Sequence, residues 1–75
     1  MFFVTAEFHM VEGWEQIDVS IIAVVNRPAY FAGVGDHMGI KTRYLEWHET
    51  SLHQALHLKE SLERITGVSV FVREG

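Results

Sequence analysis

The sequence contains no cysteine, a single proline and no apolar run long enough to cross a bilayer. The absence of cysteine excludes disulfide bonds and thiolate metal sites, so burial of apolar side chains must hold the fold together. The amino-terminal stretch MFFVTAEFHM lacks the basic start of a secretory signal and reaches Glu7 early. We therefore expect a soluble, cytosolic protein.

Positive charge is also scarce. Six Lys and Arg residues stand against ten Asp and Glu residues, which gives a formal net charge of -4. Proteins that bind phosphate backbones without sequence preference carry clustered Lys and Arg, whereas the six here are scattered. We expect an acidic protein with neither a nucleic acid nor a membrane as its partner.

Apolar side chains, in contrast, are plentiful. They make up 48% of the chain and include five Phe, two Trp and two Tyr. This composition is far from that of disordered segments, and 75 residues suffice for one small core. We predict a single domain that spans residues 1–75.

Two stretches near the amino terminus alternate between apolar and polar residues, as half-buried strands do. Residues 2–11 form the first stretch and residues 14–25 the second, with Glu12-Gly13 between them as a two-residue turn. A hairpin with this turn pairs Phe8 with Ile17 and brings apolar side chains together on one face. We predict this antiparallel hairpin.

The rest of the chain predicts a connection, a strand, a helix and a final strand. Residues 40–48 are rich in β-branched and aromatic side chains, although an i, i+4, i+7 pattern also permits a helical start there. Ser51 and Gln54 match a capping box ahead of a helix over residues 52–65. Residues 68–72 alternate again. The predicted fold class is α+β, a small antiparallel sheet of element order β-β-β-α-β with one helix on one face.

Three of the five histidines lie in the segment HETSLHQALHLK. His53 and His57 are four residues apart, as two metal ligands on one helix are, but Gln54 stands where the HExxH motif has glutamate. An exposed pair supplies two ligands, whereas zinc sites take three or four from the protein. We expect solvated histidines and no metal or other cofactor. Completion of a site by His48, Glu49 or another chain is the alternative.

The predicted hairpin raises a second chemical possibility. It places Glu7 opposite Asp18, with His9 two residues along the same strand. Paired carboxylates beside a histidine can perform acid–base chemistry or bind a hard cation. The simpler interpretation is a solvated pair whose charge Lys41 or Arg43 balances. A small metal-dependent or acid–base enzyme is therefore the alternative function.

The segment GVGDHMG is glycine-rich and follows a hydrophobic stretch, which superficially resembles a phosphate-binding loop. It lacks the Lys-Ser/Thr of a P-loop, and Met38 stands where the third glycine of the dinucleotide motif belongs. We interpret residues 28–39 as a mobile connection whose Tyr30, Phe31 and His37 are available for contact with a partner.

One helix can cover only one face of the predicted sheet, and the apolar residues of the other face then predict an interaction surface. On the second face of the predicted sheet lie five such side chains: Phe3, Trp14, Ile22, Val24 and Phe71. Large exposed apolar patches on soluble proteins usually mark a binding site. We therefore expect an interaction or regulatory protein rather than an enzyme, and an isologous homodimer built on this surface or on a strand edge beside it.

Overall fold

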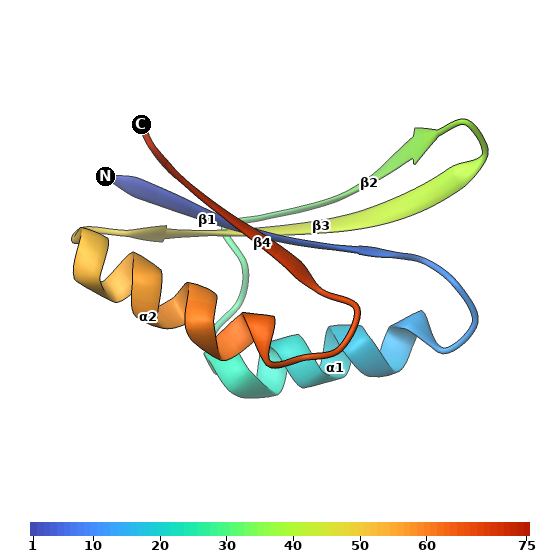
Figure 1. Cartoon of the computed structure of the whole chain (residues 1–75), viewed down its shortest axis with the longest axis horizontal. Helices are drawn as coiled ribbons and strands as arrows, with labels where there is room; N and C mark the ends of the chain where they lie inside the picture. Colours follow the sequence, from blue (N-terminus) through green and yellow to red (C-terminus); the bar gives the residue numbers. More distant parts are fainter.

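The computed structural model describes all 75 residues, Met1–Gly75. Four strands and two helices alternate along the chain in a β-α-β-β-α-β order (Figure 1). Their bounds are β1 Phe2–His9, α1 Trp14–Val25, β2 Phe31–His37, β3 Ile40–Glu49, α2 Leu52–Glu63 and β4 Ser69–Glu74.

The strands form one antiparallel sheet in the order β2-β3-β1-β4. Strands β1 and β2 are parallel to each other, and β3 lies between them. Strands β3 and β4 are likewise parallel, and β1 lies between them. The fold therefore consists of two split β-α-β units, as in the ferredoxin-like fold. Each helix makes a crossover, and two right-handed crossovers between such interleaved strands place both helices on the same face of the sheet. Figure 1 shows both helices beneath the sheet, which leaves the other face open.

The core lies between the sheet and the helices. It consists of nine buried residues, all apolar: Val4, Ala6, Phe8, Ile21, Leu45, Trp47, Ala55, Leu62 and Val70. Strands β1 and β3, the two central strands of the sheet, contribute five of the nine: Val4, Ala6, Phe8, Leu45 and Trp47. The edge strand β2 contributes none.

The prediction of a hairpin over residues 2–25 is wrong, because Trp14–Val25 forms helix α1. Its inward side carries Trp14, Ile17, Ile21 and Val25, which follow the helical period rather than alternation. The predicted pairs between β1 and this segment therefore do not exist. Strand β1 pairs with β3 and β4 instead.

The interpretation of residues 28–39 as a mobile connection is also wrong for most of that stretch. Phe31–His37 forms the edge strand β2, which pairs with β3 from Phe31 opposite Glu46 to His37 opposite Ile40. Met38 and Gly39 close a two-residue turn with positive φ values of 53° and 80°. This geometry is that of a mirror-image hairpin turn.

The predictions for the second half of the chain are confirmed. Residues 40–49 are strand β3 rather than the start of a helix, and helix α2 begins after Ser51, whose Oγ accepts a hydrogen bond from the Gln54 backbone nitrogen at 3.2 Å. The inward side of α2 is narrower than predicted, because Leu52 and Leu56 remain about half exposed.

The α+β class and the antiparallel sheet are confirmed, whereas the predicted element order lacked a helix. Two helices rather than one lie on the covered face. With 12 residues each, neither helix is long enough to span a bilayer.

Candidate functional site

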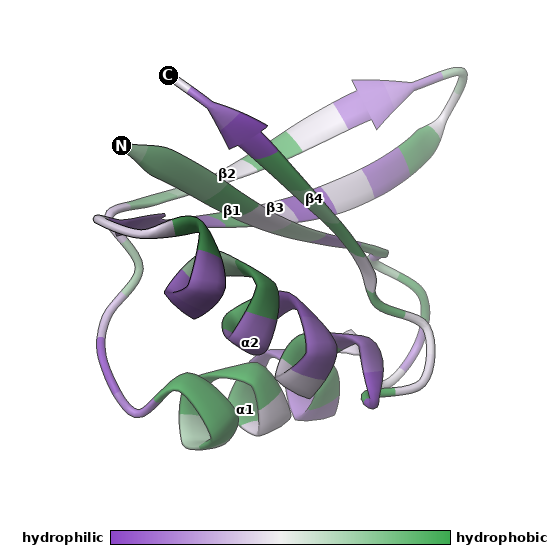
Figure 2. Ribbon diagram, turned by 60° about the vertical axis from the view of Figure 1, so that its left-hand side comes forward, coloured by the Kyte–Doolittle hydropathy of each residue, from purple (hydrophilic) through white to green (hydrophobic).

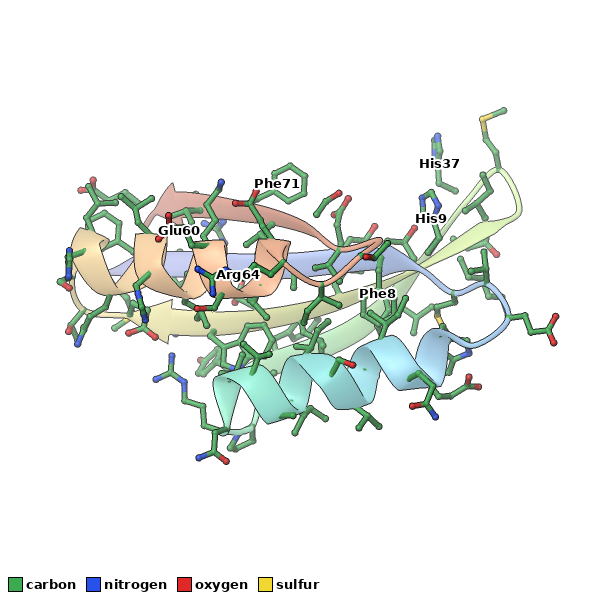
Figure 3. All side chains as sticks on the ribbon, turned by 60° about the horizontal axis from the view of Figure 1, so that its bottom comes forward. Phe8, His9, His37, Glu60, Arg64 and Phe71 are labelled. Carbon is green, nitrogen blue, oxygen red and sulfur yellow. The ribbon has the colours of Figure 1, made fainter.

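The open face of the sheet is built from every second residue of each strand. The pairing registers place Phe3, His48 and Arg73 in one row across the sheet. The next row holds Phe71, Thr5, Glu46 and Phe31, and the third holds Ser69, Glu7, Tyr44 and Gly33. Figure 3 shows Phe71 and His9 directed away from the helices, whereas Phe8 points toward α1.

Five side chains of this face form a connected cluster near the chain termini, which we call the His48 cluster: Phe3, Tyr30, Glu46, His48 and Arg73. The His48 ring lies between two aromatic rings, with centroid distances of 3.9 Å to Tyr30 and 4.5 Å to Phe3. Its Nε2 atom is 3.1 Å from Glu46 Oε2.

Arg73 completes the His48 cluster from strand β4. Its Nη2 atom lies 3.7 Å from Glu46 Oε1, and its guanidinium carbon lies 4.4 Å from the centroid of the Phe3 ring. The carboxylate of Glu46 thus faces both an arginine and a histidine. Cation–π contact and charge pairing hold long side chains flat on the sheet.

The two glycines of β2 make room for aromatic rings on the open face. A Cβ atom on Gly35 would lie 2.8 Å from Cε2 of Tyr44, and one on Gly33 would lie 3.1 Å from the Phe31 ring. The glycine-rich sequence therefore allows close packing of rings on an edge strand. The open face carries five Phe and Tyr rings, those of Phe3, Tyr30, Phe31, Tyr44 and Phe71, beside the imidazole of His48.

The structure divides the predicted interaction surface between two sides of the molecule. Phe3 and Phe71 lie on the open face, as expected, but Ile22 and Val24 lie on α1 and are about half exposed there. Trp14 is half-buried against the core. The prediction of one common face is wrong because it depended on residues 14–25 being a strand. Figure 2 shows the hydrophobic character of α1 on the helical side of the molecule.

The predicted loop contacts belong to the same open face. Tyr30 is 75% exposed although it stacks on His48, and Phe31 is about half exposed. His37 lies at the far end of β2, near His9 and on the same side of the sheet (Figure 3). Tyr30, Phe31 and His37 therefore belong to the open face of the sheet and not to a separate loop.

The predicted acid–base group is not assembled. Glu7 lies on the open face between Tyr44 and Ser69, whereas Asp18 lies on α1 behind the sheet. Arg43 pairs with Asp18 alone, with 3.3 Å between Nε and Oδ1. His48 makes no hydrogen bond to a hydroxyl group, so the structure contains no nucleophile–base pair at this histidine.

The remaining metal-ligand candidates lie apart from one another. His53 and His57 are exposed on α2, where they line a polar cleft of about 470 Å³ beside the ion pair of Arg27 and Glu49. His48 is on the other side of the sheet. No group of three or more His, Cys, Asp or Glu side chains is arranged to hold a metal ion.

A second cleft, of about 510 Å³, lies between α1 and the helix-facing side of β2 and β3. Its lining is more apolar than that of the first cleft and includes Leu45 and Trp47 from the core. We call it the α1–β2 cleft. It exists because α1 covers β3 but leaves the edge strand β2 bare, with Val34 54% exposed.

Solved structures share this fold. The chain superposes on an uncharacterized protein from Thermotoga maritima with a TM-score of 0.59 and 15% identity, over 96% of its own length and 91% of that chain. It superposes on a formyltetrahydrofolate deformylase from Pseudomonas putida with a TM-score of 0.58 and 10% identity, over 99% of its own length and only 28% of that chain. At these identities the likeness is one of fold alone.

Comparison by sequence adds no relative. No model of a known protein family matches the chain, and no curated protein matches it at a significant level. The function must therefore be argued from the surfaces described above.

Sequence reasoning missed the His48 cluster for a specific reason. Tyr44, Glu46 and His48 alternate with buried residues along β3, and this period-two signal was available. Their partners on β1 and β4 could be assigned only with the correct strand order. The predicted hairpin paired residues 14–25 with the first strand, in the position that β3 occupies in the structure. The residues that meet in the cluster were therefore not assigned to one another.

Proposed function

We propose that this domain is a non-enzymatic interaction module that forms a homodimer by packing the open face of its sheet against the same face of a second copy. The observation that carries the proposal is the aromatic character of a face that no element of the chain covers. Five Phe and Tyr side chains lie on it, and Phe71, Phe31 and Tyr30 are each more than half exposed. A regulatory or scaffolding role is the class of function that such a module serves.

The size of the face supports a second copy as the occupant. The molecule measures 35 × 23 × 18 Å, and the view along its shortest axis shows the sheet edge-on, so the face lies in the 35 × 18 Å plane. The projected area of the face is roughly 600 Å², and its accessible area is larger because side chains protrude from it. This is close to the roughly 800 Å² of accessible surface that each partner buries in a stable interface. Two twisted sheets can pack face to face with their strands nearly aligned.

The charges of the face are compatible with burial between two copies. Glu46 is paired with His48 and Arg73 within the same chain, so the aromatic cluster brings no unpaired charge with it. Glu7 makes no ion pair, but it lies away from the cluster toward the β2–β3 hairpin end of the face. An isologous interface can keep that end at its rim, where charges remain hydrated.

RNA is a weaker candidate for the same face. Four-stranded sheets with exposed aromatic residues bind single-stranded RNA in some proteins by stacking bases. The open face, however, holds two glutamates and one arginine, and the net charge of the chain is -4. Phosphates require cations along their path, so the charge favours a protein surface as the partner.

Two variants of similar exposure test this proposal. Phe71 on the open face is 54% exposed, and Ile22 on α1 is 51% exposed, so a glutamate at either site is compatible with the fold. Light scattering at about 100 µM should give a mass near twice the 8.6 kDa of the chain. We expect Phe71→Glu to reduce this mass to that of the monomer and Ile22→Glu to leave it unchanged.

Circular dichroism confirms that each variant is folded before its mass is interpreted. A monomeric wild-type protein at this concentration would refute the proposal. Dissociation by Ile22→Glu but not by Phe71→Glu would also refute it, because the interface would then lie on α1. Binding of single-stranded RNA that Phe71→Glu abolishes, without a dimer, would favour the nucleic-acid alternative.

A further inference from the structure

The α1–β2 cleft lies on the side of the sheet opposite the proposed dimer face and is independent of it. Two helices lie over a four-stranded sheet, and α1 stops short of the edge strand, so the helix-facing side of β2 has no helix above it. The connection from α1 to β2 passes one end of the cleft and contributes Pro28 and Ala29 to its wall. The cleft is therefore formed jointly by α1, the helix-facing side of β2 and β3, and the connection between α1 and β2.

The inner surface of the cleft is apolar. Leu45 and Trp47 are 4% and 2% exposed and belong to the core, while Ile22, Ala29 and Ala32 form the sides. Trp47 Nε1 donates a hydrogen bond to the Arg27 carbonyl oxygen at 3.5 Å. Small-molecule sites commonly have this character and a volume of a few hundred Å³.

The rim of the cleft carries two guanidinium groups, and each belongs to an ion pair: Arg27 with Glu49 and Arg43 with Asp18. Arg27, Arg43 and Asp18 contribute the charged groups of its lining, in a chain whose net charge is -4. Arg43 donates from Nε to Asp18 Oδ1, and its two terminal nitrogens make no hydrogen bond. A partly exposed guanidinium group with free terminal nitrogens is suited to a carboxylate, which it can bind through two parallel hydrogen bonds.

We propose that the α1–β2 cleft binds a small amphipathic monocarboxylate, such as a medium-chain fatty acid or an arylalkanoic acid. The apolar body lies between Ile22, Ala29 and Ala32, above the buried Leu45 and Trp47, and the carboxylate accepts hydrogen bonds from the terminal nitrogens of Arg43. The apolar lining excludes strongly hydrated ligands, and the free terminal nitrogens of Arg43, which can only donate hydrogen bonds, select a carboxylate over an ammonium group, which can only donate as well.

Three probes of equal chain length test the head group: decanoate and decylamine below their critical micelle concentrations, and decanol below its solubility limit. Calorimetric titration, and tryptophan fluorescence of a Trp14→Phe variant in which Trp47 is the remaining tryptophan, should show saturable binding of one decanoate per chain. We expect decanol and decylamine to bind at least about tenfold more weakly. Equal binding of decanol would overturn the assignment of the head group, and no saturable binding of any probe would overturn the site.

Three variants test the location. Ala32 is exposed on an edge strand, so Ala32→Phe fills the cleft without altering the core, and Ala23→Phe on the outer side of α1 is the matched control. We expect Ala32→Phe to weaken decanoate binding at least about tenfold, Ala23→Phe to leave it unchanged, and Arg43→Gln to remove the preference for decanoate over decanol. Decanoate binding that survives Ala32→Phe would refute the location.

The two proposals fail separately. Decanoate should bind Phe71→Glu as it binds the wild-type protein, because Phe71 lies on the other face of the sheet. If Ala32→Phe lowers the mass in light scattering, the cleft is a contact between subunits and the ligand proposal is overturned.

Discussion

Ile21 and Ile22 are neighbours in α1, and truncation of each to alanine tests which side of this helix supports the fold. Ile21 is fully buried, whereas Ile22 is 51% exposed. Both substitutions remove the same three carbon atoms and make the same change in helix propensity. Any difference in the free energy of unfolding therefore reports the difference in burial.

The expected magnitudes follow from burial. Removal of three buried carbons at position 21 loses about 2.4 kcal/mol of transfer free energy, and the cavity left behind adds about 1–2 kcal/mol. The higher helix propensity of alanine returns about 0.4 kcal/mol. We expect Ile21→Ala to lower the free energy of unfolding by about 3–4 kcal/mol, a large part of the total of about 4–11 kcal/mol for a domain of this length.

At position 22 about half of the side chain is already in water. The loss of burial is then about 1 kcal/mol, and the gain in propensity reduces the net cost to about 0.5 kcal/mol. Val19 is 61% exposed and β-branched, so Val19→Ala loses about 0.6 kcal/mol of burial and gains a similar amount in helix propensity, and its net effect should stay within about 0.5 kcal/mol of zero.

Urea denaturation followed by circular dichroism, at one fixed protein concentration, measures all three variants. The hairpin alternative puts Val19 and Ile21 in one core, so a cost above about 1 kcal/mol for Val19→Ala would refute the helix. A cost for Ile22→Ala equal to that for Ile21→Ala would show that the outer side of α1 is buried. Either result would contradict the packing described here.

Two further substitutions test the β2–β3 hairpin. Met38 has a φ of 53°, which asparagine tolerates far better than methionine. Met38→Asn should therefore raise the free energy of unfolding by about 0.5–1 kcal/mol, and Met38→Val should lower it. Gly35→Ala should cost about 1–2 kcal/mol because the new Cβ atom would lie 2.8 Å from Tyr44 Cε2. In a Tyr44→Ala protein the same Gly35→Ala change should become neutral or stabilising, and an unchanged cost there would show that the ring is not the obstacle.

Sequence patterns determined the elements whose signals were local. Helix α2 was predictable because Ser51 supplies an N-cap oxygen and its inward residues follow the helical period. Strands β1 and β3 were predictable because alternation along them matches one buried and one open face. These signals need only neighbouring residues, so they appear in the sequence directly.

Residues 14–25 show where local signals fail. Six of the twelve residues are Ile or Val, which favour strands, and so many positions are apolar that both the helical and the alternating period fit. In Phe31–His37 the sequence misled in the other direction: its glycines, which are rare in strands, indicated a loop where the structure has a strand. In both segments the choice depends on packing against distant residues, such as Tyr44 over Gly35.

The sequence alone therefore determined the α+β class, a core of apolar side chains and a surplus of exposed aromatic residues. Tertiary structure decided the strand order, and with it which residues meet: His48 with Tyr30, and Arg43 with Asp18. The physical reason is that each crossover helix joins two strands that are not neighbours. The partners across the sheet are consequently set by chain topology, which no local period encodes.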